Sequence, residues 1–449
     1  MTGRQHPVTE ALVEFALGLE ANRLPEPVVE AATACLLDWM GTAIRGSREP
    51  MADALERVIV AAGGAPQATI LGRGRKTSAL WASLANGAQS HAMDFDDTHV
   101  PSLIHGSAPV APVVLALAEW RGQSGGEALA AFVAGFEVEA RIGRVIGHAL
   151  AERGWHATGT VGTFGAAVAA GKLLGLDAPR LKQALGIAGT QAAGLEQSFG
   201  TMCKPFHPGK AAMNGLLAAL LAQEGFTGPA GILEGTGSLP QTFLGNADLT
   251  PALDALGHRF EILENSFKPY AACLLTHATI DAGRAIRERW KPVVEEVAAV
   301  ECRVYPLTMK VAAIPRPRTG LEGKFSLPYC AALGLLVGDG GEQRFSDAAV
   351  SDPELQALAT KVRVAADSSL AEAEAVMRVT LTGGRVFEEH VKTARGNPGN
   401  PSSREELEEK FRSLAGSTIP RDRVEALITG IRAFPTLPDV ERLVTLAAP

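Results

Sequence analysis

Residues 162–176 read GTFGAAVAAGKLLGL, and residues 210–226 read KAAMNGLLAALLAQEGF. Both runs are apolar or small on nearly every side of a helix. A helix of this kind is buried by other helices instead of lying on a solvent-exposed surface. The segment 111–122, APVVLALAEWRG, has the same character. These runs predict a helical core, and the abundance of Ala and Gly predicts that its helices pack closely.

The composition is that of a globular protein with more than one hydrophobic core. The chain has 449 residues, of which 46% are hydrophobic and 20% are charged. This length exceeds the usual size of a single core, so two domains are expected. The 42 basic and 49 acidic residues leave a net charge of −7. We find no basic stripe interleaved with aromatic residues, so we expect no nucleic-acid partner.

The pattern changes near residue 266. Residues 7–265 read mostly as helices, whereas 297–309 reads as a strand and 374–392 as a β-hairpin with Gly383-Gly384 at its turn. A Pro- and Gly-rich linker begins at residue 395, and Ser402 with Glu405 has the spacing of a capping box for a new helix. The predicted fold class is therefore mainly α. A large all-helical domain spans 1–265 plus 400–449, with a smaller inserted α+β lid domain at 266–399.

Targeting and redox signals favour the cytoplasm. Glu10, Glu14 and Glu20 interrupt the N-terminal stretch, which lacks the pattern of a signal peptide, and no run of 18 apolar residues predicts a membrane span. The five cysteines are scattered and form no C-x-x-C pair. Neither a disulfide framework nor a thiolate zinc site is indicated.

The stretch 91–109, HAMDFDDTHVPSLIHGSAP, crowds carboxylates, histidines and hydroxyls against an apolar helical run. Asp94, Asp96 and Asp97 could bind a divalent cation, but the spacing is that of neither an EF-hand nor a DDxxD motif. Helix capping or solvated carboxylates at a helix end are the plainer interpretation. Asp94 and Thr98 are four residues apart, so on a helix they would share one face and Asp96 and Asp97 would point elsewhere.

Three further segments carry candidate polar residues. Lys204 and His207 precede a buried helix expected near Ala211, where the helix N-terminus would help to hold a carboxylate. His156 lies in a Gly/Thr-rich turn before another helix, and Lys268 lies at the expected domain boundary, where pockets are common. A surface lysine, a structural histidine and a linker residue are the alternative interpretations. GRGRKT at 72–77 lacks the spacing of a P-loop and follows no clear strand, so we expect no ATP site.

Taken together, these segments resemble the MmgE/PrpD family. The resemblance runs over nearly the whole chain and in the family's order. It is carried by five motifs: HAMDFDDTH (91–99), WHATGTVGTFGAA (155–167), KPFHPGKAAMNGLLAALLAQEGFTGP (204–229), FKPYAACLLTHATIDA (267–282) and KFSLPYCAA (324–332). The family includes 2-methylcitrate dehydratases, cis-aconitate decarboxylases and an iminodisuccinate epimerase. The resemblance implies a helical domain with an α+β lid, a homodimer, and no cofactor or metal.

The resemblance to the cis-aconitate decarboxylase branch also implies roles for individual residues. The implied active-site residues are Asp94, Thr98, His105, His156, Lys204 and Lys268. Two positions depart from that branch: Cys273 stands where it has a histidine, and Met309 stands where it has a tyrosine on the following strand.

The chemistry shared by the family needs a buried, electropositive pocket. An enolate-like intermediate must be stabilised by preorganised cations and donors. We expect Lys204, Lys268 and His105 to clamp substrate carboxylates and His156 to shuttle a proton, with Asp94 orienting a neighbour and Thr98 donating to a carboxylate.

We therefore expect a cytoplasmic, metal-independent homodimeric lyase that acts on a small polycarboxylate. Dehydration of a 2-methylcitrate-like di- or tricarboxylate is the first expectation. Epimerisation and decarboxylation on the same scaffold remain alternatives. Further alternatives are a non-catalytic protein that binds organic acids and a metal-dependent enzyme that uses the aspartates. We expect neither a nucleic-acid nor a membrane partner.

Overall fold

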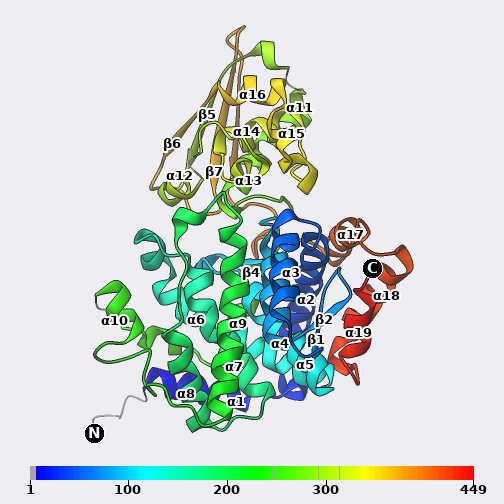
Figure 1. Cartoon of the computed structure of the whole chain (residues 1–449). Coiled ribbons are helices and arrows are strands. Elements are labelled where there is room, and N and C mark those ends of the chain that lie inside the picture. The colour runs from blue at the N-terminus through cyan, green and yellow to red at the C-terminus, as the bar shows by residue number, and fades with distance from the viewer. Residues whose placement is uncertain (1–6, 246–247, 292, 313) are drawn as a thin grey trace. The chain divides into compact units, whose positions relative to one another are not determined.

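The computed structural model describes residues 7–245, 248–291, 293–312 and 314–449 (Figure 1). The chain divides into two compact units. The larger one comprises Met1–Ala92, Asp96–Asn265 and Ser403–Pro449, and the smaller one comprises Met93–Phe95 and Ser266–Ser402. The first is helical and the second combines helices with a four-stranded sheet, so the prediction of a mainly α fold with a smaller α+β part is confirmed.

The helical unit contains long buried helices and shorter ones around them. Its helices are α1 (Val8–Gly18), α2 (Glu26–Gly46), α3 (Pro50–Ala62), α4 (Ala79–His91), α5 (Ser107–Arg121), α6 (Gly125–Glu152), α7 (Ala157–Leu173), α8 (Ala178–Gly189), α9 (Cys203–Gln223), α10 (Leu239–Leu244), α17 (Arg404–Ala415), α18 (Arg421–Arg432) and α19 (Glu441–Leu446). Its short strands are β1 (Ala68–Ile70), β2 (Arg75–Thr77) and β3 (Thr98–His99), and β4 (Asn265–Ser266) lies at its end.

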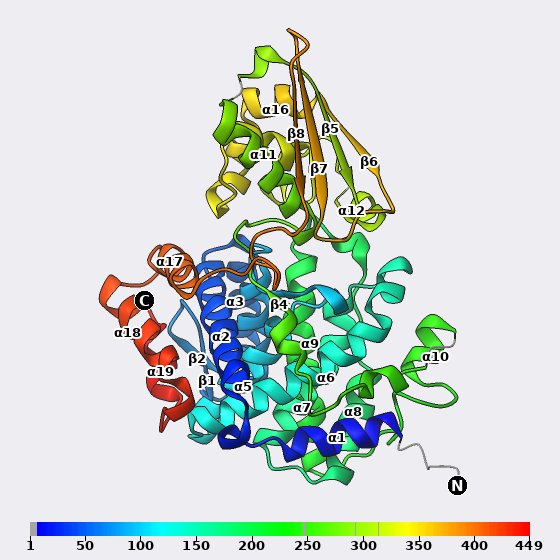
Figure 2. The ribbon, with the colours of Figure 1, turned by 180° about the vertical axis from the view of Figure 1, so that it is seen from behind.

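The core of this unit forms where α7 packs against α6, α9 and α5. Almost every residue of α7 is buried, as its all-round apolar sequence predicts. Small side chains make the packing close: a Cβ added at Gly215 of α9 would lie 2.5 Å from the Cβ of Ala166 in α7. Figure 2 shows α17 beside α2 and α3, and α17 packs on α2, whereas α19 packs on α5.

Two local predictions were wrong by a small margin. The capping box of α17 uses Ser403 and Glu406 instead of Ser402 and Glu405, a shift of one residue. The stretch 72–77, for which no preceding strand was expected, follows β1 and ends in β2, which pairs with β1 as an antiparallel hairpin.

The smaller unit is built on a sheet of strand order β6-β5-β7-β8. Its strands are β5 (Val297–Val304), β6 (Val362–Ala366), β7 (Ala375–Leu381) and β8 (Val386–Val391). Its helices are α11 (His277–Trp290), α12 (Pro306–Val311), α13 (Gly320–Gly323), α14 (Leu327–Leu336), α15 (Asp347–Val350) and α16 (Pro353–Ala359).

Alternation of buried residues sets the faces of this sheet. In β5, Val300, Cys302 and Val304 are buried, and residues between them are exposed, which is the period of two expected of a strand with one covered face. α11 packs on β7 and β8, and it also packs on α14. β7 and β8 form the predicted hairpin, and Gly384 has a φ of +82°, which glycine adopts without strain.

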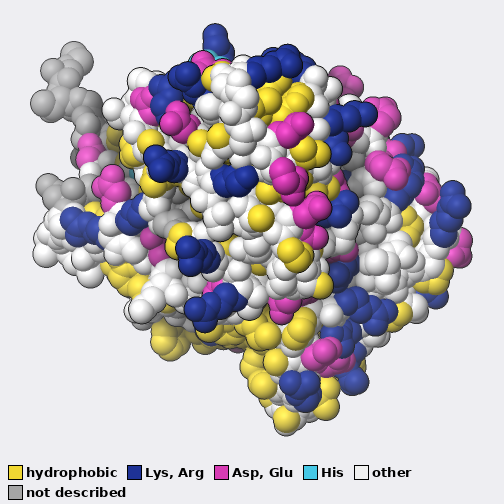
Figure 3. Space-filling view, turned by 90° about the horizontal axis from the view of Figure 1, so that it is seen from above, with side chains coloured by type: hydrophobic (Ala, Val, Ile, Leu, Met, Phe, Trp, Pro, Cys, Tyr) yellow, Lys and Arg dark blue, Asp and Glu magenta, His cyan; other side chains and the backbone are white. Residues whose placement is uncertain are grey.

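The surface carries charged side chains of both signs, as the composition of the sequence predicts. Figure 3 shows basic and acidic side chains interspersed on the face that it presents. Among the helices of the described residues, none combines the length and the apolar character needed to cross a bilayer.

Candidate active site

The Asp-rich motif follows the end of a buried helix. α4 ends at His91, and the chain then turns through Asp94, which has a φ of +52°, before entering β3 at Thr98. The expectation that Asp94 and Thr98 share a helix face was therefore wrong, because the left-handed backbone at Asp94 cannot continue a helix.

Asp96 lies at the centre of a buried hydrogen-bonded cluster in the helical unit. One of its carboxylate oxygens, Oδ2, lies 2.8 Å from Nδ1 of His91 and 3.2 Å from Nδ1 of His105. The Oγ1 atom of Thr98 lies 3.2 Å from the same nitrogen of His105. The backbone N–H of His105 donates to Oγ1 of Thr158 in the first turn of α7, at 3.1 Å. Asp96 was expected to point away from the site, whereas it anchors two of its imidazoles.

The charge state of this cluster follows from burial and hydrogen bonding. Burial alone would raise the pKa of Asp96, but attraction to His91 and His105 and their hydrogen bonds hold it well below its usual value. Burial lowers the pKa of His91 to about 3, despite Asp96. At neutral pH the carboxylate is therefore ionised, and neutral His91 donates to it through Nδ1–H. In the described part of the chain, Nε2 of His91 is buried and has no hydrogen-bond partner.

His156 lies beside this cluster as the N-cap residue of α7. Its ring is stacked on that of His91, with centroids 5.7 Å apart and planes 23° apart. The edge of another ring, Phe199, meets it at a centroid distance of 5.1 Å. The backbone N–H of His156 donates to the carbonyl of Gly194 at 3.0 Å. Burial, followed by the charge of Lys204, holds the pKa of His156 well below its usual value.

Lys204 completes the group in the helical unit. It lies in the first turn of α9, which begins at Cys203, and only 5% of its surface is exposed. The helix was expected to begin near Ala211, so Lys204 and His207 lie inside it and not before it. The Nζ atom of Lys204 lies 5.4 Å from the ring centroid of Phe199, which also contacts His156. A cation over an aromatic face is stabilised by the ring quadrupole.

Four of the six predicted residues therefore share one buried neighbourhood. Thr98 contacts His105, and Asp96 links His105 to His91. The ring of His91 is stacked on that of His156. The ring of Phe199 contacts both His156 and Lys204. Sequence reasoning assigned no role to His91 or His207, and it considered Asp96 only as a possible ligand of a divalent cation. The only sequence signal for the site at His91 and Asp96 is that they stand in the same motif as Asp94 and Thr98.

The other two predicted residues, Lys268 and Asp94, form an ion pair in the smaller unit. The Nζ atom of Lys268 donates to the carboxylate oxygen Oδ1 of Asp94 at 2.7 Å and to its backbone carbonyl at 2.9 Å. Only 1% of the surface of Lys268 is exposed. Asp94 was expected to orient a histidine or a lysine, and its partner here is a lysine; the role of the pair in the reaction stays a prediction.

Asp97 points to a different set of partners. It accepts hydrogen bonds from Ser107 Oγ at 2.9 Å and from Asn265 Nδ2 at 2.6 Å. Burial, followed by repulsion from Asp38 and Asp96, raises the pKa of Asp97 to about 7. The carboxyl group of Asp97 is therefore a buried acid whose hydrogen bonds go to Ser107 and Asn265 and not to the imidazoles of the cluster.

The two positions that depart from the decarboxylase branch lie in the smaller unit. Cys273 is buried, and its backbone N–H donates to the carbonyl of Lys324 at 3.0 Å. Met309 lies in α12, so the expectation of a strand there was wrong. It packs against an apolar cluster that includes Val304 and Leu327.

His91, Asp96 and His105 are also residue types that can hold a divalent cation, and their candidate ligand atoms lie within 4.8 Å of one another. In the structure, however, Nδ1 of each ring faces the carboxylate at hydrogen-bonding distance. We therefore assign these atoms to hydrogen bonds.

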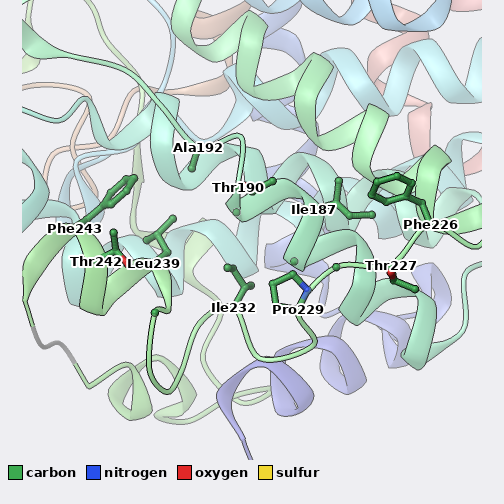
Figure 4. A pocket seen from close by; sticks show the side chains of 14 residues that line it. Ile187, Thr190, Ala192, Phe226, Thr227, Pro229, Ile232, Leu239, Thr242 and Phe243 are labelled. Carbon is green, nitrogen blue, oxygen red and sulfur yellow. The ribbon is translucent and has the colours of Figure 1, made fainter.

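A separate cleft of about 550 Å³ opens in the helical unit (Figure 4). Ile187, Phe226, Pro229, Ile232 and Leu239 give it a mostly apolar lining. None of the six predicted residues is among those that line it. Its lining contains no cationic side chain of the kind that a polycarboxylate needs.

Comparisons with known proteins match the chain over nearly its whole length. Residues 10–252 match the MmgE/PrpD N-terminal domain, and residues 270–433 match the MmgE/PrpD C-terminal domain. The chain is 31% identical to the cis-aconitate decarboxylase of Mus musculus, covering 98% of this chain and 93% of the relative. It is 29% identical to the cis-aconitate decarboxylase of Aspergillus terreus, over 98% of this chain and 95% of that relative. It is 28% identical to the cis-aconitate decarboxylase of Homo sapiens, over 98% of this chain and 94% of that relative. Decarboxylases of this kind are carboxy-lyases, and the expectation of a lyase agrees with them.

Proposed function

Because the chain belongs to the MmgE/PrpD family, we propose that it is a lyase that removes carbon dioxide from a small unsaturated tricarboxylate such as cis-aconitate. The observation that carries this proposal is the burial of Lys204 near the neutral imidazole of His91, which the carboxylate of Asp96 holds in place together with the ring of His105. The named activity of the relatives supports the reaction type. Decarboxylation thereby moves ahead of dehydration, which was the first expectation from the sequence.

The proposed reaction breaks the bond between a carbon atom and its carboxylate. Carbon dioxide leaves, and the electron pair stays on the carbon skeleton as an enolate-like anion, which then takes up one proton. Lys204 and His105 bind carboxylates and stabilise the anion in a site with little water, where such interactions are strong. His156 delivers the proton.

We propose that Lys268 and Asp94 also take part. A buried ion pair is costly to desolvate and is weak evidence for a purely stabilising role. The pair is hydrogen-bonded twice and almost fully buried, which supports a functional reason for keeping it. Replacing Lys268 with Met should lower turnover, and Lys310→Met, at an exposed lysine of α12, provides a lysine control in the same unit that should turn over like the wild type.

Dehydration remains the second candidate because of Cys273 and Met309. A thiol and a thioether stand where the resemblance implies a histidine and a tyrosine, so an imidazole and a phenol of the decarboxylase branch are missing at these positions. A reaction that depends on those groups would have to proceed here without them.

A substrate panel separates the candidates. The purified protein is incubated in deuterated water with cis-aconitate, trans-aconitate, citrate and 2-methylcitrate, and the mixtures are followed by ¹H NMR with trapping of carbon dioxide. We expect carbon dioxide and a product carrying one deuterium atom from cis-aconitate. Loss or gain of water without carbon dioxide would establish dehydration instead. Deuterium exchange without net conversion would indicate an epimerase.

We further propose that the protein is a cytoplasmic homodimer, as expected from the sequence. Large apolar side chains exposed on the helical unit, among them Val58 and Val60 of α3 and Phe226, support an interface with a second copy. Light scattering at micromolar concentration should give twice the mass of one chain, and the mass of one chain would contradict the dimer.

A further inference from the structure

His207 contacts the proposed proton carrier directly. The Nδ1 atoms of His156 and His207 lie 3.0 Å apart, and their ring centroids are 5.2 Å apart. Two imidazole nitrogens at this distance form a hydrogen bond in which one donates and the other accepts. Because the bond uses Nδ1 of His156, its Nε2 is the nitrogen left to exchange a proton with a substrate.

Building on the proposed function, we propose that His207 is a positioning residue. It accepts the Nδ1–H of His156, so that the tautomer of His156 is fixed and its protonated form is stabilised during turnover. When His156 carries a second proton, both of its nitrogens are donors, and only an acceptor at His207 Nδ1 satisfies the contact.

The fold holds the two rings together from three segments. His156 is the N-cap of α7, and His207 lies in the second turn of α9. Gly194, from the loop before α9, accepts the backbone N–H of His156. A Cβ at Gly194 would lie 3.3 Å from Nδ1 of His207 and 3.5 Å from Cβ of His156, so the loop closes tightly over the pair. Its φ of +135° also favours glycine.

The charge that His156 takes up during turnover assigns it the role of donor, and His207 stays neutral as the acceptor. Burial, followed by the charge of Lys204, lowers the pKa of His207 to about 4, so this ring is neutral at working pH. The titratable groups that act on His156 are Lys204, His91, His207 and His105, and all of them lower its pKa in the free enzyme. A bound polycarboxylate adds negative charge beside His156 and raises its pKa, so His156 takes a proton from solvent at Nε2 as the substrate binds.

The proton balance then closes over one turnover. His156 gives the Nε2 proton to the carbon atom from which carbon dioxide has left, and it returns to its neutral state. One proton from solvent is consumed for each carbon dioxide released. His207 keeps its own proton on Nε2 throughout and touches no reacting atom.

Two variants of His207 test the proposal by steady-state release of carbon dioxide between pH 5.5 and 8.5. His207→Leu removes the acceptor and should lower kcat about 100-fold, within the range for a proton-transfer group, with KM changed less than about threefold. It should also move the alkaline fall of kcat to lower pH by about one unit, because protonated His156 loses its partner. His207→Asn places an amide oxygen near the lost Nδ1 and should restore kcat to within about tenfold of the wild type. The exposed His258→Leu is the matched control and should behave as the wild type.

A second measurement does not depend on activity. In ¹⁵N NMR spectra of histidine-labelled protein, the His156 signals, assigned by their loss in His156→Gln, should show a protonated Nδ1 in the wild type. An unprotonated Nδ1, or a His207→Leu variant with the kcat and pH profile of the wild type, would overturn the proposal. If the wild type releases no carbon dioxide from any polycarboxylate, the proposed function fails, and the NMR spectrum still decides whether His207 sets the tautomer of His156.

Discussion

Oδ2 of Asp96 lies 2.8 Å from Nδ1 of His91, and both side chains are buried in the helical unit. The same oxygen also accepts from His105. One carboxylate thus fixes the orientation of two imidazoles, of which His105 is the one proposed to bind substrate.

Replacing Asp96 with Asn should therefore disorder the site without adding bulk. Hydrogen bonds to a charged group contribute about 1.5–3 kcal/mol, so we expect kcat/KM to fall about 10- to 150-fold. Steady-state kinetics on the substrate found in the panel would measure this. Asp97→Asn is the matched control, since Asp97 bonds to Ser107 and Asn265, and it should stay within about threefold of the wild type. Equal losses in both variants would contradict a specific role for Asp96.

The raised pKa of Asp97 predicts a pH-dependent stability. The folded protein keeps a proton on this carboxyl up to about pH 7, whereas the unfolded chain releases it near the ordinary value of 3.8. Between these values the folded state binds more protons, so the contribution of Asp97 to the free energy of unfolding falls as the pH rises. Asn does not titrate. The free energy of unfolding of Asp97→Asn minus that of the wild type should thus be about 1–2 kcal/mol larger at pH 8 than at pH 5.5.

Urea unfolding followed by circular dichroism at the two pH values measures this difference. A gap between variant and wild type that is the same at both pH values would show that Asp97 is already ionised in the folded protein.

Metal removal should leave the enzyme unaffected. The Nδ1 atoms of His91 and His105 are directed at Asp96, and the proposed reaction uses the ammonium group of Lys204 as its buried cation. We expect elemental analysis to find no stoichiometric metal and prolonged dialysis against EDTA to preserve kcat. About one metal ion per chain, with activity lost on chelation and restored by adding that ion, would support the metal-dependent alternative.

The fold could be predicted from sequence because its signals are long and local. The all-round apolar runs that form α7 and α9 have no stable environment other than a helical core. The alternation in β5 and the Gly383-Gly384 turn equally have one simple interpretation. The capping box was misplaced by one residue because Ser402 and Ser403 are followed at the same distance by Glu405 and Glu406, and only the backbone distinguishes them.

The site was less predictable, because its geometry depends on irregular backbone and on distant segments. The spacing of Asp94 and Thr98 suggested a helix, but α4 ends at His91 and the following turn brings Asp96 to His105 instead. The contact between His156 and His207 joins two residues that are 51 positions apart in sequence, one at the start of α7 and one near the start of α9. No local pattern encodes such a contact.

In the proposed reaction, buried Lys204 binds and stabilises the anion formed when a tricarboxylate loses carbon dioxide. The most direct test is the release of labelled carbon dioxide from ¹³C-carboxylate cis-aconitate by the wild type, Lys204→Met and Lys182→Met, measured side by side. Lys182 is a partly exposed lysine paired with Glu10 in the same unit and serves as the control. Loss of a cation from a desolvated charge pair costs about 2–5 kcal/mol, which predicts at least about a 30-fold slower release from Lys204→Met and an unchanged rate from Lys182→Met. Equal rates from all three proteins, or no labelled carbon dioxide from the wild type, would contradict the claim.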